Sequence, residues 1–347
     1  MRGRGAAYNP PNRFEKLAYA PDPDEDADEA PGPKTVFLKD ASRTLITYNE
    51  SPDVGFDASI NPYRGCEHGC IYCYARPTHE YLGFSAGLDF ETKILVKDDA
   101  PRLLRKDLSA KSWAPQVVAI SGVTDPYQPI EKKLRLTRSC IEVFAEFRNP
   151  VLIVTKNNLI TRDIDLLAEM ARFSAAAAFL SVTTLDENLA RIMEPRASIP
   201  SRRLAAIEAL AGAGVPVGVL VAPVVPGLTD HEITSIINAA VNAGARFAGY
   251  TIMRLPYAVA PLFEDWLTRH FPDRKKKVLS HVQDLRGGKL NDPRFNSRMR
   301  GEGVYAEQIR GMFALACRVA GIEGRRPSLS AESFRRPVEG QYRLFDD

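Results

Sequence analysis

The sequence predicts an α/β protein whose core is an open, partial (β/α)6 barrel of the TIM type. Short apolar, β-rich runs alternate along the chain with amphipathic helical patterns. Such alternation indicates right-handed β–α–β units that place their strands in parallel. The unit recurs about six times, too few for a closed eightfold barrel. We therefore expect functional residues at the C-terminal ends of the strands, where barrels of this type carry their sites.

Each predicted strand and helix has a local signal. Near-continuous apolar runs suit parallel strands buried on both faces. Besides the strand that enters at about residue 58, these runs lie at 117–120, 151–154, 177–182, 217–221 and 247–252. Helical periodicity predicts segments at 134–147, 163–172, 201–211 and 231–243. Ser201 is the expected N-cap of its helix, which Gly212 and Gly214 follow.

Outside the barrel the sequence changes character. Residues 1–33 contain the acidic, proline-bounded run 22–29, and we expect them to form a disordered tail. Residues 34–57 hold two β-type runs, at 35–38 and 44–48, which predict an N-terminal flap. We expect the barrel itself over residues 58–256. Helical patterns at 262–270, 276–285 and 305–319 predict a helical C-terminal extension, residues 257–347, that closes one side of the barrel.

The composition is that of an ordinary soluble enzyme, with 45% hydrophobic and 26% charged residues among 347. No run of about 18 uncharged apolar residues occurs, so we expect no membrane span. The N-terminus lacks an apolar export segment, and five cysteines do not make a disulfide framework. We therefore expect a cytoplasmic protein, with Cys140 and Cys317 as buried small hydrophobic residues of helices.

A basic segment lies near the C-terminal end. The net charge of +3 is small, but residues 271–300 carry nine Lys or Arg residues against three Asp. Such a run forms either a surface that follows the phosphates of a nucleic acid or a solvated helix face. The sequence leaves both interpretations open.

Three cysteines lie close together, with the spacing C-x3-C-x2-C, at Cys66, Cys70 and Cys73. Gly65 and Gly69 flank the first two, and glycine lets a backbone wrap closely around an inorganic group. A structural zinc site normally closes with four protein ligands, and so does a complete 4Fe–4S cluster. Three ligands therefore favour an iron–sulfur cluster with one iron left open for chemistry. The alternative is a zinc site that His68 or His79 completes.

This motif, with Tyr72 before the last cysteine, resembles the signature of the radical S-adenosylmethionine (SAM) superfamily. The resemblance implies that Cys66, Cys70 and Cys73 hold a 4Fe–4S cluster whose open iron binds SAM. In that family an electron from the cluster cleaves SAM to a 5′-deoxyadenosyl radical, which takes a hydrogen atom from the substrate. It also implies an electron donor of the flavodoxin or ferredoxin type.

The resemblance extends to residues at the predicted strand ends. Ser121, Thr124 and Asp125 occupy the place of groups that hold the SAM ammonium, and Lys156 is placed to pair with the SAM carboxylate. The remaining implied contacts are those of Ser181 and Thr183 with the ribose and of the Tyr72 backbone with the adenine.

Longer stretches resemble the spore photoproduct lyase branch of the superfamily, namely residues 70–74, 194–203 and 214–223. Tyr72 and Tyr74 match tyrosines implicated there in radical transfer, and we take them as candidate catalytic residues; packing is the alternative. One departure concerns the cysteine that returns a hydrogen atom in the lyase. Residues 121–125 contain no cysteine, and Cys140 lies a helix away.

Three functions follow from these observations. The leading one is a radical SAM enzyme, of the lyase or a related type, with a nucleic acid as candidate substrate through residues 271–300. The second keeps the radical chemistry but modifies a peptide or a small molecule. The third is a non-catalytic, zinc-stabilised nucleic-acid-binding protein. Fold kinship does not transfer a substrate, so the sequence leaves the substrate open.

Overall fold

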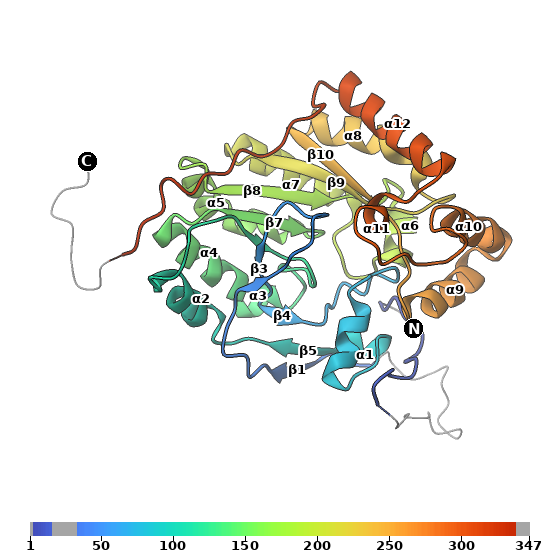
Figure 1. Cartoon of the computed structure of the whole chain (residues 1–347), viewed down its shortest axis with the longest axis horizontal. Helices are drawn as coiled ribbons and strands as arrows, with labels where there is room; N and C mark the ends of the chain where they lie inside the picture. The colour runs from blue at the N-terminus through green and yellow to red at the C-terminus, as the bar shows by residue number, and fades with distance from the viewer. Residues whose placement is uncertain (1–2, 16–32, 338–347) are drawn as a thin grey trace.

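The main sheet of the computed structural model, which describes residues 3–15 and 33–337, is the predicted open barrel (Figure 1). Its strands run in the order β10-β9-β8-β7-β6-β3-β2. All pairs from β3 to β10 are parallel, and β2 joins β3 antiparallel at one edge. Six parallel strands confirm the partial (β/α)6 architecture. The strands are β2 (Thr47–Tyr48), β3 (Ala58–Ile60), β6 (Val118–Ile120), β7 (Val151–Thr155), β8 (Ala176–Ser181), β9 (Val217–Val224) and β10 (Phe247–Ile252).

Helices connect these strands, and their apolar faces share one buried cluster with the sheet. Phe144, Ile207 and Ile237 come from three of these helices and are fully buried in that cluster. The connecting helices are α2 (Ala100–Ser109), α3 (Glu131–Leu134), α4 (Leu136–Phe147), α5 (Ile164–Ala171), α6 (Glu187–Met193), α7 (Pro200–Gly212) and α8 (Ile233–Asn242), with 3-10 turns η2 (Asn158–Asp163) and η3 (Asp230–Glu232).

The expected N-cap of α7 is wrong. Helix α7 begins at Pro200, with Ile199 as its N-cap. Proline suits the first helical position because that backbone nitrogen needs no intrahelical partner. Ser201 thus lies inside the helix, and its hydroxyl donates to the Glu187 carboxylate at 2.7 Å.

A second sheet, in the order β1-β5-β4, lies beside the barrel. The two β-type runs of the predicted flap end up in different sheets, since β1 pairs with β5 whereas β2 borders the main sheet. Sequence reasoning missed β5 and the two short helices before it. The elements are β1 (Val36–Lys39), β4 (Tyr63–Arg64), η1 (Arg76–Leu82), α1 (Leu88–Thr92) and β5 (Lys93–Val96).

Residues 3–15 differ from the disordered tail that the sequence predicts. Ala6 is 1% exposed, and the backbone amides of Gly5 and Ala6 donate to the Glu91 carboxylate at 3.0 and 2.9 Å. Further along, Leu88 N donates to Tyr8 O at 3.3 Å. These specific contacts order the segment, which we call the N-terminal strap (residues 3–15). The acidic run 22–29 lies outside the described residues.

The C-terminal extension packs on two sides of the barrel. Helix α12 lies over α8 (Figure 1), and its Ile309 is buried in the main core. Helices α9 and α10 contribute Trp266 and Val282 to a second buried cluster, which also contains Cys70 and Tyr72. The extension comprises α9 (Val259–His270), α10 (Pro272–Asp284), α11 (Ser297–Arg300) and α12 (Val304–Val319). Among residues 3–15 and 33–337, no helix is long and apolar enough to cross a bilayer.

Candidate functional site

The cysteine loop lies between β4 and η1, and glycines shape its bends. Gly65 and Gly69 have φ values of +80° and +66°, which favour glycine. A Cβ atom on Gly69 would lie 2.6 Å from Glu91 Oε2, so only glycine allows this close approach. Backbone bonds fix the loop at both ends: Cys66 N donates to Phe90 O at 2.9 Å, and Ile71 N donates to Met193 O at 3.0 Å.

A buried arginine forms hydrogen bonds with the backbone of the cysteine loop. Arg76 is fully buried, and its guanidinium donates to Cys70 O at 3.0 Å and to Gly69 O at 3.1 Å. It also pairs with Glu91 Oε1 at 2.5 Å. The same carboxylate accepts the strap amides of Gly5 and Ala6. The Arg76–Glu91 pair therefore joins the cysteine loop to the N-terminal strap, and sequence reasoning missed both residues.

The three thiols share one environment. Cys66 and Cys70 are buried, and Cys73 packs against the apolar groups around both of them. Burial raises the pKa of each thiol, because desolvation disfavours the thiolate. Bound iron would reverse this preference, since a metal ion stabilises the thiolate that it binds.

The donor set fits an iron–sulfur cluster better than a zinc ion. Three soft thiol ligands on one glycine-shaped loop suit an Fe–S cluster. In the described part of the chain, no three His, Cys, Asp or Glu side chains stand in a metal-binding arrangement. Of the two histidines proposed as a fourth zinc ligand, His68 is engaged at both ring nitrogens, whereas the buried Nδ1 of His79 has no hydrogen-bond partner among the described residues. His68 Nδ1 lies 3.4 Å from Asp125 Oδ2, and His79 Nε2 lies 2.9 Å from Lys93 O.

A buried polar network lies beside the loop and contains three of the residues singled out in the sequence. The Tyr72 hydroxyl donates to the Glu194 carboxylate and lies 3.2 Å from Thr183 Oγ1. Lys156 Nζ has three acceptors, Thr183 Oγ1 at 3.1 Å, Ala222 O at 2.8 Å and Glu194 Oε1 at 3.1 Å. Tyr72, Lys156 and Thr183 thus converge on a carboxylate that sequence reasoning did not assign.

Glu194 is ionised at the centre of this network. Burial alone would raise its pKa, but Arg203 and Lys156 outweigh that effect and hold the pKa well below its usual range. Arg203 is buried as well, and it donates to Ser181 O at 2.9 Å and Ser198 O at 2.6 Å. The sequence did contain a signal for these two residues. Glu194 and Arg203 are the charged ends of the 194–203 stretch, which resembles the lyase branch.

Asp125 organises the strand ends next to this network. Its carboxylate accepts from Thr155 Oγ1 at 2.6 Å, Lys156 N at 2.7 Å and Tyr127 N at 2.9 Å. Burial would raise its pKa, but His68 and these hydrogen bonds lower it overall. Both oxygens are therefore in use within the protein. The contact of Asp125 with the SAM ammonium stays a prediction.

The other predicted SAM contacts lie at neighbouring strand ends. Ser121 and Thr124 follow β6, where Thr124 Oγ1 donates to Tyr63 O at 2.9 Å and Ser121 Oγ donates to Thr124 O at 3.3 Å. Ser181 ends β8 and is 4% exposed. The structure thus gathers the residues after β6, β7 and β8 at one end of the barrel, as the parallel topology requires. Their roles toward SAM stay predictions.

Tyr74 and Cys140 differ in their access to this end of the barrel. The Tyr74 side chain is exposed, and its hydroxyl donates to Gly122 O at 2.5 Å. The Arg254 guanidinium lies 4.9 Å from the centre of the Tyr74 ring. Cys140, by contrast, is fully buried on α4 within the main core. Tyr74 is therefore available to a bound molecule, whereas the Cys140 thiol is not.

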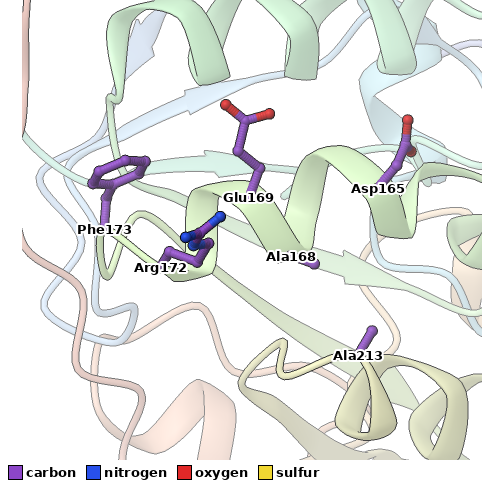
Figure 2. Close-up of a pocket in the computed structure, with 6 residues that line it drawn as sticks. All are labelled: Asp165, Ala168, Glu169, Arg172, Phe173 and Ala213. Atoms are coloured by element: carbon purple, nitrogen blue, oxygen red, sulfur yellow. The ribbon is translucent and has the colours of Figure 1, made fainter. Parts of the chain in front are cut away.

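A separate hollow of about 820 Å³ lies between α5 and the end of α7 (Figure 2). Asp165 and Glu169 border it from α5, Arg172 and Phe173 from the residues that follow α5, and Ala213 from just after α7. None of these residues belongs to the loop or to the strand ends described above. The chemistry of the cysteine loop, not the size of this hollow, locates the candidate site.

The solved structures that resemble this chain include a spore photoproduct lyase variant. It matches with a TM-score of 0.58 and 17% sequence identity over 82% of this chain and 79% of the lyase chain. At this level of identity the match supports the fold alone.

Sequence relatives provide independent evidence. An uncharacterised protein of Mycobacterium tuberculosis is 36% identical over 250 residues, which are 71% of this chain and 72% of the relative. A Radical SAM Nalpha-GlyT isomerase of Pseudomonas phage M6 is 28% identical over 219 residues, 62% of this chain and 43% of the phage protein. The family model described as the radical SAM superfamily matches residues 60–240, which contain the cysteine loop and the strand ends. With this match over half of its length, the chain belongs to the radical SAM superfamily.

Proposed function

We propose that this chain is an enzyme that cleaves SAM reductively on a 4Fe–4S cluster held by Cys66, Cys70 and Cys73, and that a nucleic acid is its substrate. Family membership supports the cluster and SAM. The cluster and SAM together would supply a 5′-deoxyadenosyl radical that abstracts a hydrogen atom from the substrate. The zinc-protein alternative loses support, because the chain belongs to the radical SAM superfamily.

The residues around the loop orient SAM and exclude water. Lys156, Ser181 and Thr183 lie at or just after the ends of β7 and β8, and in this proposal they contact the carboxylate and ribose of SAM. All three N–H donors of the Lys156 ammonium have acceptors within the protein. To bind the SAM carboxylate, Lys156 must therefore release one of these acceptors. Glu194 and Arg203 stabilise this arrangement, because they form a buried ion pair next to it.

One observation carries the nucleic-acid proposal: exposed aromatic rings stacked with arginines at the mouth of the barrel. Tyr74 and Phe295 are 47% and 53% exposed. Arg254 lies over the Tyr74 ring, and Arg298 lies 4.5 Å from the centre of the Phe295 ring. Aromatic platforms combined with positive charge are what single-stranded nucleic acids bind, because bases stack on rings while phosphates meet cations. We call these four residues the aromatic–arginine patch.

The basic segment 271–300 supports the proposal only in part. Arg294 pairs with Asp292 and Glu302, and Arg298 pairs with Asp53 at 2.5 Å. These pairs neutralise part of the positive charge that the sequence suggests. Other cations of the segment stay exposed, namely Arg274, Lys276 and Lys277 on α10 and, beyond that helix, Lys289 and Arg300. Residues 271–300 therefore contribute Phe295 and Arg298 to the aromatic–arginine patch, and Arg254 adds a positive charge that forms no ion pair among the described residues.

Anaerobic reconstitution tests the cofactor part of the proposal. We expect about four irons per chain, broad visible absorbance, and cleavage of SAM on reduction. Cys66→Ala should lose all three, whereas Cys140→Ala, the matched cysteine control, should keep them. Stoichiometric zinc without iron in the wild-type chain would refute the proposal.

Binding of single-stranded DNA or RNA tests the substrate part. Arg254→Gln should weaken binding and lower the slope of log K against log salt by about one. The matched control Arg102→Gln, an exposed arginine of α2, should change neither. Absence of binding at low salt would favour the peptide or small-molecule alternative.

The type of reaction follows from where the hydrogen atom returns. A lyase that uses a cysteine for this step needs one near the strand ends, but residues 121–125 contain none and Cys140 is buried. This observation favours an isomerase-type reaction, in which the abstracted hydrogen returns to the product. With deuterated substrate, an isomerase retains deuterium in the product, whereas a reaction with another hydrogen donor leaves it in 5′-deoxyadenosine.

A further inference from the structure

The edge strand β1 presents an unusual surface beside the cysteine loop. Among residues 3–15 and 33–337, strand β1 pairs with β5 alone, and it ends the small sheet. Val36 and Phe37 are 51% and 42% exposed on it. An open edge with large exposed apolar side chains is a typical site of protein–protein contact.

Cations lie beside Phe37, one of these two apolar side chains. Arg4, Lys34 and Arg196 line a hollow of about 470 Å³ together with Phe37. Lys39 is exposed two residues beyond Phe37, and it therefore lies on the same face of the strand. An apolar centre with a charged rim is the usual anatomy of a specific protein interface.

The positive charge of this face is only partly compensated. Arg4 Nη2 donates to Thr35 Oγ1 at 3.1 Å and Arg196 Nη1 donates to the same atom at 3.3 Å, so one hydroxyl holds two guanidinium groups. Among the described residues, Glu67 is the acidic partner of Arg196, at 3.0 Å. Burial and the charge of Arg196 lower the pKa of Arg4, as expected where like charges are crowded.

The hollow reaches the cysteine loop. Glu67, which lines it, follows Cys66 directly in the chain and is 3% exposed. Arg196, which also lines the hollow, is joined to the loop, because its backbone N donates to His68 O at 3.2 Å. Tyr74 and Arg254, at the mouth of the barrel, do not line this hollow. A protein on this face would therefore approach the loop without covering the aromatic–arginine patch.

We propose that the face formed by Arg4, Lys34, Phe37, Lys39 and Arg196, the β1 face, is the docking surface for an acidic electron-transfer protein of the flavodoxin or ferredoxin type. The inference rests on the proposed function, because only reductive cleavage of SAM calls for such a partner. The docked donor loses one electron and the cluster gains it, with no bond made or broken between the proteins. Complementary charge accelerates such encounters and makes them sensitive to salt.

Binding to the metal-free full-length chain tests the β1 face independently of activity. We expect an acidic bacterial flavodoxin to bind saturably at about 0.01 M ionic strength and more weakly at about 0.15 M, where screening shortens the range of charge. Lys34→Glu/Lys39→Glu changes two exposed side chains and should raise the Kd about tenfold or more. The matched control Lys132→Glu/Lys133→Glu, two exposed lysines of α3, should leave the Kd unchanged. Phe37→Ala, which changes no charge, should weaken binding without altering its salt dependence.

Reduction kinetics provide the second readout. In reconstituted protein, Lys34→Glu/Lys39→Glu should slow reduction of the cluster by flavodoxin but not by dithionite, which needs no docking surface. Equal loss in the α3 control, an unchanged Kd in the β1 variant, or no saturable binding at low salt would overturn the docking surface. Failure to assemble a cluster would instead refute the proposed function, while the binding result would still decide the β1 face.

Discussion

Replacing Glu91 by glutamine should destabilise the fold and free the N-terminal strap. Glu91 and Arg76 are both fully buried and lie 2.5 Å apart. Removing one charge of a buried pair costs about 3–5 kcal/mol, because the other charge stays desolvated without a counterion. The glutamine side chain also has an NH2 group in place of one carboxylate oxygen. One of the backbone N–H groups of Gly5 and Ala6 would then face a donor instead of an acceptor. This loss is a large share of the roughly 5–15 kcal/mol that stabilises a typical domain.

Urea unfolding of the metal-free chain measures the effect. With an m-value of about 3 kcal/mol/M, the midpoint should fall by about 1–2 M. The matched control Asp265→Asn breaks an exposed pair with Arg269 and should cost less than about 1 kcal/mol. Hydrogen exchange should also show loss of protection at Gly5 and Ala6 in the Glu91→Gln protein. A midpoint within error of the wild type, with those amides still protected, would refute this account of the pair.

Three further outcomes are expected. Burial lowers the pKa of His79 from 6.5 to about 4. As the pH falls, the unfolded chain therefore binds a proton at this histidine before the folded chain does. The stability that His79 contributes is complete above pH 6.5 and declines toward pH 4, by up to about 3 kcal/mol. An NMR titration that places its pKa near 6.5 would contradict this. Asp125→Asn should cost about 1–3 kcal/mol in urea unfolding, since both oxygens of that carboxylate accept hydrogen bonds, and an unchanged midpoint would contradict that role. Gly5→Ala should accelerate alkylation of the loop thiols, because its Cβ would lie 1.8 Å from Gly69 O, whereas Gly212→Ala has open space and should not. Equal alkylation rates in the two variants would count against a strap that covers the loop.

The barrel and the cysteine loop could be predicted because their signals are local. The apolar runs that became β6 to β10 are short and continuous, and parallel strands buried on both faces require such runs. The three cysteines and their glycines fall within nine consecutive residues. The strand-end positions of Asp125, Lys156 and Ser181 followed from the topology alone, since parallel strands present their C-terminal ends at one edge.

Local sequence patterns could not predict contacts between residues that are far apart in the chain. Gly5 and Glu91 are separated by 86 residues, and Tyr72 and Glu194 by 122. Residues 3–15 have the composition of a tail, yet they are ordered because Glu91, Asp89 and Glu80 accept or exchange hydrogen bonds with them. Likewise, residues 271–300 look like one basic surface until Asp53, Asp292 and Glu302 neutralise part of it.

The sequence by itself therefore determined the α/β class, the open barrel and the ligand loop, because period, run length and spacing are properties of neighbouring residues. The tertiary structure alone decided which charges are buried together, which arginine holds the loop, and which faces beside it stay open. The physical reason is that desolvation, ion pairing and close backbone approach depend on distances in space. These distances are set only when segments such as the strap and η1 pack against each other.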